Sequence, residues 1–206
     1  VILEFKTKSN NIKYFLENDV PHNIICTWSL NTQTIIDNEE HLTASLDERI
    51  NSARTLADKG VLVGFHFHPI VQYKNYLEEY KVVYDRLQND FTSDEVVLIS
   101  MGTLTFIKPV MKQLREREMK TKILQMPFET INGKQSYSIE TKKEMFKHAY
   151  DSFSSWHGKV YFYLCMEAHS LWKDVFGYEY SSNNQMEDMM KMSYWGKINN
   201  LKVKDT

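Results

Sequence analysis

The sequence predicts an α/β fold of parallel βα units, arranged as a barrel with its site at the carboxyl ends of the strands. Short apolar, β-branched runs alternate repeatedly with helical patterns along the chain, which is typical of parallel βα units. Polar residues also gather directly after the predicted strands, where barrel proteins build their sites. A doubly wound sheet is the alternative, although no glycine-rich phosphate loop follows any strand.

Composition and charge narrow the class of protein. The 42% hydrophobic content of the 206 residues allows a sizeable core, and no run approaches the roughly 18 apolar residues of a membrane span. The net charge of -2 gives no general attraction to nucleic acid, so any contact with DNA has to come from a local patch. Cys26 and Cys165 are too few for a disulfide framework, so we expect a cytoplasmic protein.

The first predicted strand starts with the chain itself. Residues 1–7 have the pattern of a strand, and no initiator methionine precedes Val1. We therefore expect the chain to be a fragment of a longer protein. An incomplete barrel would leave one strand edge open, which favours aggregation or dimerisation of the isolated chain.

The next elements are two short ones and a long helix. Residues 12–18 predict a short helix, and the β-branched and aromatic run 23–28 predicts a second strand. After a loop, the clearest helix begins at a capping box formed by Ser45 and Glu48. Gly60 stands just after its predicted end, where a left-handed residue is common.

The strand that organises the chain follows this helix. Residues 61–63 form the continuous apolar run of a strand buried on both faces, and Pro69, which lacks an N–H, sets the strand's end near His68. Because side chains alternate along a strand, His66 and His68 share one face. Two imidazoles thus lie where an α/β fold builds a site, although a hydrogen-bonded structural pair explains them equally well.

The rest of the pattern continues the alternation and adds a hairpin and a tail. Helices are expected over 74–88, 109–118, 141–154 and 169–175, and strands over 95–100, 122–124 and 160–165. Asn132-Gly133 is a tight-turn signal that predicts a hairpin. Residues 178–206 contain four methionines between 186 and 192 and suggest a loosely packed tail, which leaves 1–177 as the barrel portion.

A series of motifs then appears in a specific order and spacing. The motifs are Trp28-Ser29-Leu30-Asn31, Glu40, Thr43, Ser45-Leu46, Arg49, Gly60, Val63-Gly64-Phe65-His66-Phe67-His68-Pro69-Ile70, Ile99-Ser100-Met101-Gly102-Thr103-Leu104, Leu164-Cys165-Met166-Glu167, Trp172 and Val175-Phe176-Gly177. Together they resemble the carboxyl-terminal half of spore photoproduct lyase-like radical SAM proteins. The resemblance spans most of residues 1–177.

This resemblance implies a partial TIM-type barrel that binds S-adenosylmethionine beside a four-iron four-sulfur cluster. Cleavage of that cofactor gives a 5′-deoxyadenosyl radical, with which the lyase abstracts hydrogen from a thymine dimer of DNA. Lys8 and Ser29 match the lysine and serine that hold the methionyl carboxylate, and both side chains are suitable donors. Asn31 and His66 are expected in the same pocket, although Asn31 equally suits a turn. His68 falls where the lyase has a small residue beside the cofactor.

The sequence also departs from the family. The family's cluster is held by three cysteines spaced CxxxCxxC, and this chain has two cysteines, neither of them in such a motif. We therefore expect the cluster ligands, and the hydrogen-donating cysteine of the lyases, upstream of Val1, so that this chain alone is inactive. Thr105 stands where the family is expected to have an arginine. The predicted hairpin region holds Lys134 and Tyr137, a cation and a stacking surface for a DNA substrate.

Two other function classes stay open. An HxH motif on a barrel strand is a common part of the metal site in metal-dependent hydrolases. Such a site needs further ligands at other strand ends, and we predict no metal site in this chain. The other class is a barrel piece that binds a nucleotide or a partner without chemistry. No residue is assigned a catalytic role. Glu167 is interpreted as a general base or as a carboxylate at a helix start, and Arg49 as part of a solvated helix face.

Overall fold

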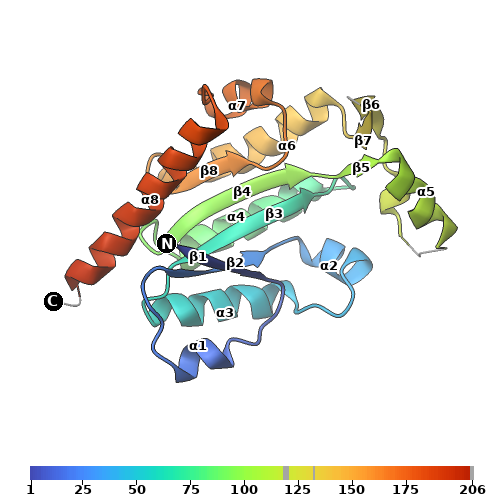
Figure 1. Cartoon of the computed structure of the whole chain (residues 1–206). Coiled ribbons are helices and arrows are strands. Elements are labelled where there is room, and N and C mark those ends of the chain that lie inside the picture. The colour runs from blue at the N-terminus through green and yellow to red at the C-terminus, as the bar shows by residue number, and fades with distance from the viewer. Residues whose placement is uncertain (118–120, 132, 205–206) are drawn as a thin grey trace.

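One parallel sheet forms the centre of the molecule (Figure 1). The computed structural model describes residues 1–117, 121–131 and 133–204. The strands of the main sheet, in their spatial order, are β1 (Leu3–Thr7), β2 (Ile24–Ser29), β3 (Val63–Ile70), β4 (Val96–Thr103) and β8 (Tyr161–Leu164). All neighbouring pairs are parallel and the spatial order follows the chain, which is the arrangement of an open, partial TIM-type barrel. The predicted α/β fold of parallel βα units is confirmed.

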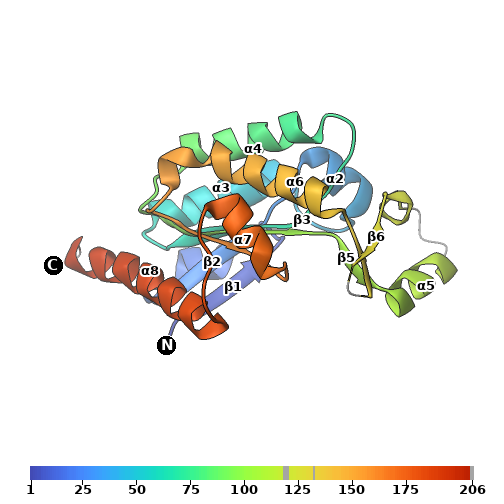
Figure 2. The same ribbon diagram turned by 90° about the horizontal axis from the view of Figure 1, so that it is seen from above.

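Helices lie on both sides of this sheet (Figure 2). The helices of the described residues are α1 (Lys13–Glu17), α2 (Gln33–Glu39), α3 (Leu46–Asp58), α4 (Tyr76–Asp90), α5 (Lys108–Glu116), α6 (Ile139–Ser152), α7 (His169–Phe176) and α8 (Asn183–Lys204). We call the side covered by α3, α4 and α6 the outer face and the side covered by α8 the inner face. None of the helices in the described ranges is both long and apolar enough to cross a membrane.

The main hydrophobic core lies between the outer face and its helices. Phe65 and Phe67 of β3 point into it and are fully buried. The ring of Phe67 packs edge-on against Tyr84 of α4, with the ring centres 5.0 Å apart. The tyrosines of α4 at helical spacing are therefore core residues. Burying one such aromatic ring contributes about 1.5–3 kcal/mol, so this layer holds β3 firmly in place.

Helix α3 begins where the sequence predicts. The Ser45 hydroxyl accepts a hydrogen bond from the backbone N–H of Glu48 at 3.3 Å, and the Glu48 carboxylate accepts one from the backbone N–H of Ser45 at 2.8 Å. Such a cap stabilises a helix by about 1 kcal/mol. After the helix, Gly60 has φ +85°, the left-handed conformation that glycine adopts without steric cost. Both predictions are confirmed.

The structure corrects four details of the secondary structure. Residues 33–39 form α2, which was not predicted, and its N-cap Thr32 accepts a hydrogen bond from the backbone N–H of Ile35. Residues 123–125 form a 3-10 turn instead of a strand. Strand β3 continues past Pro69 to Ile70, because the pairing with β4 changes register there and no longer requires an N–H from the proline.

The fourth correction concerns the predicted tail. Residues 183–204 form helix α8, which packs against the inner face of the sheet. Tyr194 and Ile198 of α8 are buried against Ile25 of β2, Leu98 of β4 and Leu62, which directly precedes β3. Met190, Tyr194 and Ile198 of α8 are spaced four residues apart and pack in this layer. Because Met189, Met192 and Val203 of the same helix are exposed, the sequence of α8 has no single apolar stripe that could have predicted this packing. Residues 205–206 of the predicted tail lie outside the described residues.

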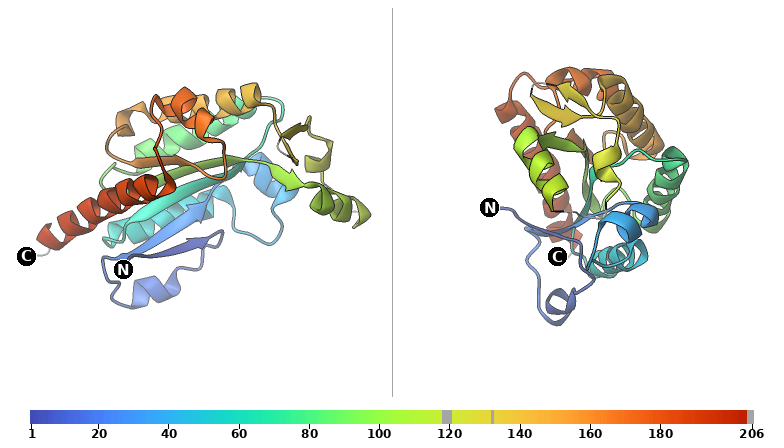
Figure 3. Two further views of the ribbon diagram at one scale, coloured as in Figure 1. Left: turned by 45° about the horizontal axis from the view of Figure 1, so that its top comes forward. Right: turned by 90° about the vertical axis from the view of Figure 1, so that its right-hand side faces the viewer.

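A small second sheet extends from the carboxyl end of β4 (Figure 3). Its strands are β5 (Thr105–Ile107), β7 (Lys134–Ser136) and β6 (Glu129–Ile131), paired antiparallel in that order. The predicted hairpin is therefore confirmed as β6–β7, while its turn residue Asn132 lies outside the described residues. Residue 118, the predicted last residue of the helix that follows β5, also lies outside them.

Candidate active site on the inner face

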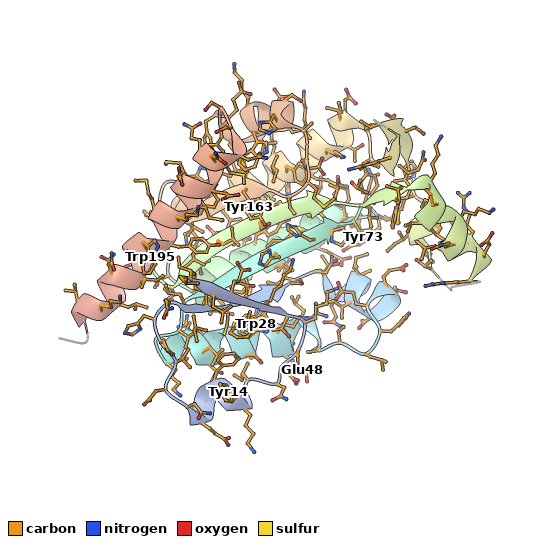
Figure 4. All side chains as sticks on the ribbon, in the orientation of Figure 1. Tyr14, Trp28, Glu48, Tyr73, Tyr163 and Trp195 are labelled. Carbon is orange, nitrogen blue, oxygen red and sulfur yellow. The ribbon has the colours of Figure 1, made fainter. Side chains whose placement is uncertain are left out.

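The inner face carries a group of polar side chains that come from all five strands of the main sheet. The group consists of Glu4, Lys6, Thr27, His66, His68, Ser100 and Tyr163, and Tyr163, labelled in Figure 4, extends from β8. The pairing registers place Ser29 beside His66, His66 beside Ser100, and Ser100 beside Tyr163. Because side chains alternate along each strand, residues in these paired rows point to the same face.

His66 is held by a carboxylate. Its Nε2 lies 2.9 Å from Oε1 of Glu4, which also accepts a hydrogen bond from the Thr27 hydroxyl at 2.9 Å. Burial lowers the pKa of His66, so the ring is neutral and donates from Nε2. Burial by itself raises the pKa of Glu4, but the contacts with His66 and Thr27 lower it overall. The other ring nitrogen, Nδ1, is a buried acceptor with no partner among the described residues.

His68 lies next to His66, with the ring centres 5.3 Å apart, as the strand alternation predicts. Its Nε2 is 2.5 Å from Oγ of Ser100, and its Nδ1 is 3.5 Å from Nζ of Lys6. Burial, with smaller contributions from Lys6 and His66, lowers the pKa of His68 to about 3, so the imidazole is neutral near pH 7. The ammonium of Lys6 can only donate, so Nδ1 accepts and Nε2–H donates to Ser100. Ser100 is paired with Tyr163 in the neighbouring strand β8, so the two side chains point to the same face.

Lys8 and Ser29 lie at the carboxyl ends of β1 and β2, directly after the paired residues Thr7 and Trp28. Nζ of Lys8 is 2.9 Å from a carboxylate oxygen of Glu40. The ammonium has three hydrogens, so this ion pair leaves donors for a further acceptor. The Ser29 side chain is mostly buried, with 6% of the residue exposed.

Arg49 contacts both the backbone of Ser29 and Glu40, the partner of Lys8. It is fully buried, and the prediction of a solvated helix face is wrong. Its guanidinium pairs with Glu40 at 2.8 Å, and donates to the backbone oxygens of Ser29 at 2.9 Å and of Ala44 at 2.8 Å. Burial alone raises the pKa of Glu40, but hydrogen bonds from Lys8 and Arg49 outweigh it and lower the pKa. Glu40 is therefore a carboxylate shared by two cations.

Asn31 has the turn role that the sequence left open. Only 1% of the residue is exposed. Its amide nitrogen donates to the backbone oxygen of Pro69 at 3.1 Å, and its side-chain oxygen accepts from the Tyr80 hydroxyl at 2.5 Å and from the backbone N–H of Thr32 at 3.1 Å. These bonds fix the turn between β2 and α2. A cofactor contact by Asn31 is not needed to explain its burial.

The two residues expected to contact DNA have different environments. Lys134 is exposed on β7. Tyr137 is fully buried, its ring packs against Phe128 with the ring centres 5.4 Å apart, and its hydroxyl accepts from the backbone N–H of Gln72 at 3.1 Å. The prediction that Tyr137 offers a stacking surface is therefore wrong.

With this geometry in place, comparison with known proteins shows the family. A family model described as spore photoproduct lyase matches residues 1–151. The chain belongs to the spore photoproduct lyase family. Among curated relatives, the spore photoproduct lyase of Clostridium acetobutylicum is 39% identical over 79 residues, which are 37% of this chain and 23% of that protein. The spore photoproduct lyase of Bacillus subtilis is 28% identical over 125 residues, 59% of this chain and 36% of that protein.

Solved structures of the family agree in fold. A spore photoproduct lyase complexed with dinucleoside spore photoproduct superposes with a TM-score of 0.69 at 21% identity. The match covers 80% of this chain and 51% of that one, so the chain spans about half the length of that lyase. A double mutant of the lyase, solved with bound AdoMet and dinucleoside spore photoproduct, matches equally well. The resemblance predicted from the motifs is confirmed.

The residues of this chain do not by themselves fit an iron–sulfur cluster. In the described ranges, no group of three or more histidine, cysteine, aspartate and glutamate side chains could hold a metal ion. Cys26 is buried in the main hydrophobic core on the outer face of the sheet, and burial raises its pKa to about 11. A thiol of this kind is inert as a ligand, because the thiolate is the binding form. This result also gives no support to a hydrolase built on His66 and His68.

Several residues of the site were not predicted. Glu4 and Lys6 alternate with the apolar residues of β1, so they share a face with Lys8, and this spacing was the signal that could have identified them.

Glu167, expected to be a base or a helix-start carboxylate, is instead buried in an ion pair with Lys142 at 2.7 Å. It also accepts a hydrogen bond from the Thr103 hydroxyl at 2.8 Å, and so ties the end of β8 to β4 and α6.

Proposed function

We propose that this chain is the S-adenosylmethionine-binding part of a radical SAM enzyme that repairs a photoproduct of DNA. The observation that carries the proposal is the pair Lys8 and Ser29 at adjacent strand ends, supported from behind by Arg49 and Glu40. A lysine with free donor hydrogens beside a hydroxyl suits the carboxylate of the methionyl group. Membership of the spore photoproduct lyase family, and relatives solved with AdoMet and a dinucleoside photoproduct, support the same function.

The rest of the inner face suits an organic cofactor. The buried Nδ1 of His66 is an acceptor that a hydroxyl or amino group of a ligand can satisfy. His68 is neutral, so it lies on the inner face without adding charge, and its Nδ1 faces Nζ of Lys6 at 3.5 Å. Bound beside a four-iron four-sulfur cluster, S-adenosylmethionine supplies radical chemistry. In this proposal the cluster is held by cysteines outside these 206 residues, and the chain alone is inactive.

Binding of S-adenosylmethionine tests the proposal directly. In isothermal titration calorimetry with the 206-residue chain, we expect Lys8→Met to weaken binding by at least about tenfold, because a hydrogen bond to a charged group contributes about 1.5–3 kcal/mol. Ser29→Ala should weaken it by a smaller factor. Lys13→Met, on the exposed helix α1, serves as the control and should bind as the parent chain does. Equal affinity of the Lys8→Met variant and the parent would contradict the proposal.

A second experiment separates catalysis from simple binding. The 206-residue chain is joined to a lyase segment that carries the CxxxCxxC motif, and the cluster is reconstituted. Repair of a dinucleoside spore photoproduct by this joined protein, but not by the chain alone, is the expected result. Binding of S-adenosylmethionine without any repair would favour the alternative of a non-catalytic nucleotide-binding barrel.

A further inference from the structure

Positive charge is concentrated in one segment of this slightly acidic chain. Residues 108–134 contain five lysines and two arginines against three glutamates, a net charge of +4. The whole chain has a net charge of -2, so the remaining residues together carry -6. The segment comprises α5, the 3-10 turn and the β6–β7 hairpin, which project together from the carboxyl end of β4 (Figure 1, Figure 3).

Within this segment, α5 and β7 line a groove of about 500 Å³. Its lining residues are Lys108, Met111, Lys112, Arg115, Glu116 and Gln135, and we call it the α5 groove. Lys108, Lys112 and Arg115 are spaced by four and three residues, so they form one row along the helix. At 1.5 Å per residue the row is about 10 Å long. Three cations in a row of this length match the spacing of successive phosphates along a nucleic acid strand.

The charges in this row are available to a ligand. Among the residues that the structure describes, the groove contains one ion pair, Lys112 with Glu116, at 3.8 Å. Both side chains of that pair are largely exposed, at 79% and 61%, and such pairs contribute little. Met111 is the buried residue of α5 and also lines the groove. The cations are therefore presented along one helix and remain hydrated.

We propose that the α5 groove binds the phosphate backbone of the DNA whose lesion enters the inner-face site. The inference rests on the proposed function, and it assigns a positioning surface outside the inner-face site. Strand β4, which carries Ser100, leads through Leu104 into β5 and α5, so one continuous stretch connects the site to the groove. Phosphate contacts of this kind fix the position and register of DNA without recognising its bases.

Fluorescence anisotropy with a short undamaged DNA duplex tests the groove. The variant Lys108→Glu, Lys112→Glu, Arg115→Glu is compared with Lys13→Glu, Lys191→Glu, Lys202→Glu, which changes the net charge equally on α1 and α8, away from α5. We expect the first variant to lose at least about tenfold in affinity and to lower the salt slope of log Kd by about 2 to 3. The control should lose no more than about threefold. Equal losses in the two variants would overturn the proposal.

Two further measurements keep this result separate from the proposed function. S-adenosylmethionine affinity is measured on the Lys108→Glu, Lys112→Glu, Arg115→Glu variant and should equal that of the parent chain, because these three residues lie on α5, away from the inner face. A chain that binds DNA through α5 but not S-adenosylmethionine would refute the proposed function alone. Displacement of the duplex by polyglutamate as efficiently as by unlabelled duplex would overturn the assignment to nucleic acid. The milder variant Lys112→Gln, Arg115→Gln repeats the test if the triple variant does not fold.

Discussion

Replacing Arg49 by methionine should be one of the most damaging single changes in this protein. The guanidinium is fully buried and donates to Glu40 and to the backbone oxygens of Ser29 and Ala44. Methionine has similar length but no donors, so Glu40 would keep only Lys8, and the carbonyl oxygens of Ser29, which is buried, and of Ala44, which is half-buried, would lose this donor. Removing one partner of a buried ion pair costs about 3–5 kcal/mol, a large part of the 5–15 kcal/mol typical of a domain.

Urea denaturation followed by tryptophan fluorescence measures this loss. Arg86→Met is the matched control, because Arg86 pairs with Asp47 and Asp90 on the surface and should cost at most about 1 kcal/mol. The double variant Arg49→Met, Glu40→Gln should lose about 1–3 kcal/mol less than the two single losses added together, since the charge left unpaired is then also removed. An Arg49→Met variant no less stable than Arg86→Met would refute this reasoning.

Three further predictions concern pH and packing. Burial lowers the pKa of His68 from its ordinary 6.5 to about 3. Below pH 6.5 the unfolded chain therefore binds a proton that the folded chain does not, and the stability of the fold decreases as the pH decreases. In denaturation experiments between about pH 7 and 5, His68→Gln should make this pH dependence less steep. Burial alone raises the pKa of Glu95, but Arg54 outweighs it and lowers this pKa to about 2. The stabilisation by the ionised Glu95 is therefore present above pH 4.5 and is lost as the pH decreases below that value. In acid denaturation, Glu95→Gln should lose less stability over this range than the parent chain, and an unchanged curve would contradict the role of the ion pair. Gly64→Ala should lower the stability by about 1–3 kcal/mol, because an added Cβ would lie 3.0 Å from the Thr27 methyl carbon. Gly196→Ala in α8 should instead raise the stability by up to about 1 kcal/mol, because an added Cβ there has no neighbour within 4 Å. Thermal denaturation compares the two variants, and the reverse order of stability would be inconsistent with this packing.

Most of the fold was predictable because its signals are local. Alternation of apolar runs with helical patterns identified the parallel βα units, and the capping box at Ser45 and the glycine at position 60 gave the ends of α3. The shared face of His66 and His68 follows from the two-residue period of a strand alone. The sequence motifs were also sufficient for the family, because their order along the chain does not depend on the folded structure.

The partners of individual side chains could not be predicted in this way. The sequence around Arg49 resembles a solvated helix surface, yet Glu40 and the end of β2 enclose it. Tyr137 follows a hairpin that looks exposed, yet its ring is buried against Phe128. The sequence by itself determined most of the strands and helices and the family that they form. The tertiary structure alone decided which polar groups are buried and paired, because burial depends on residues that are distant in the chain and adjacent only after folding.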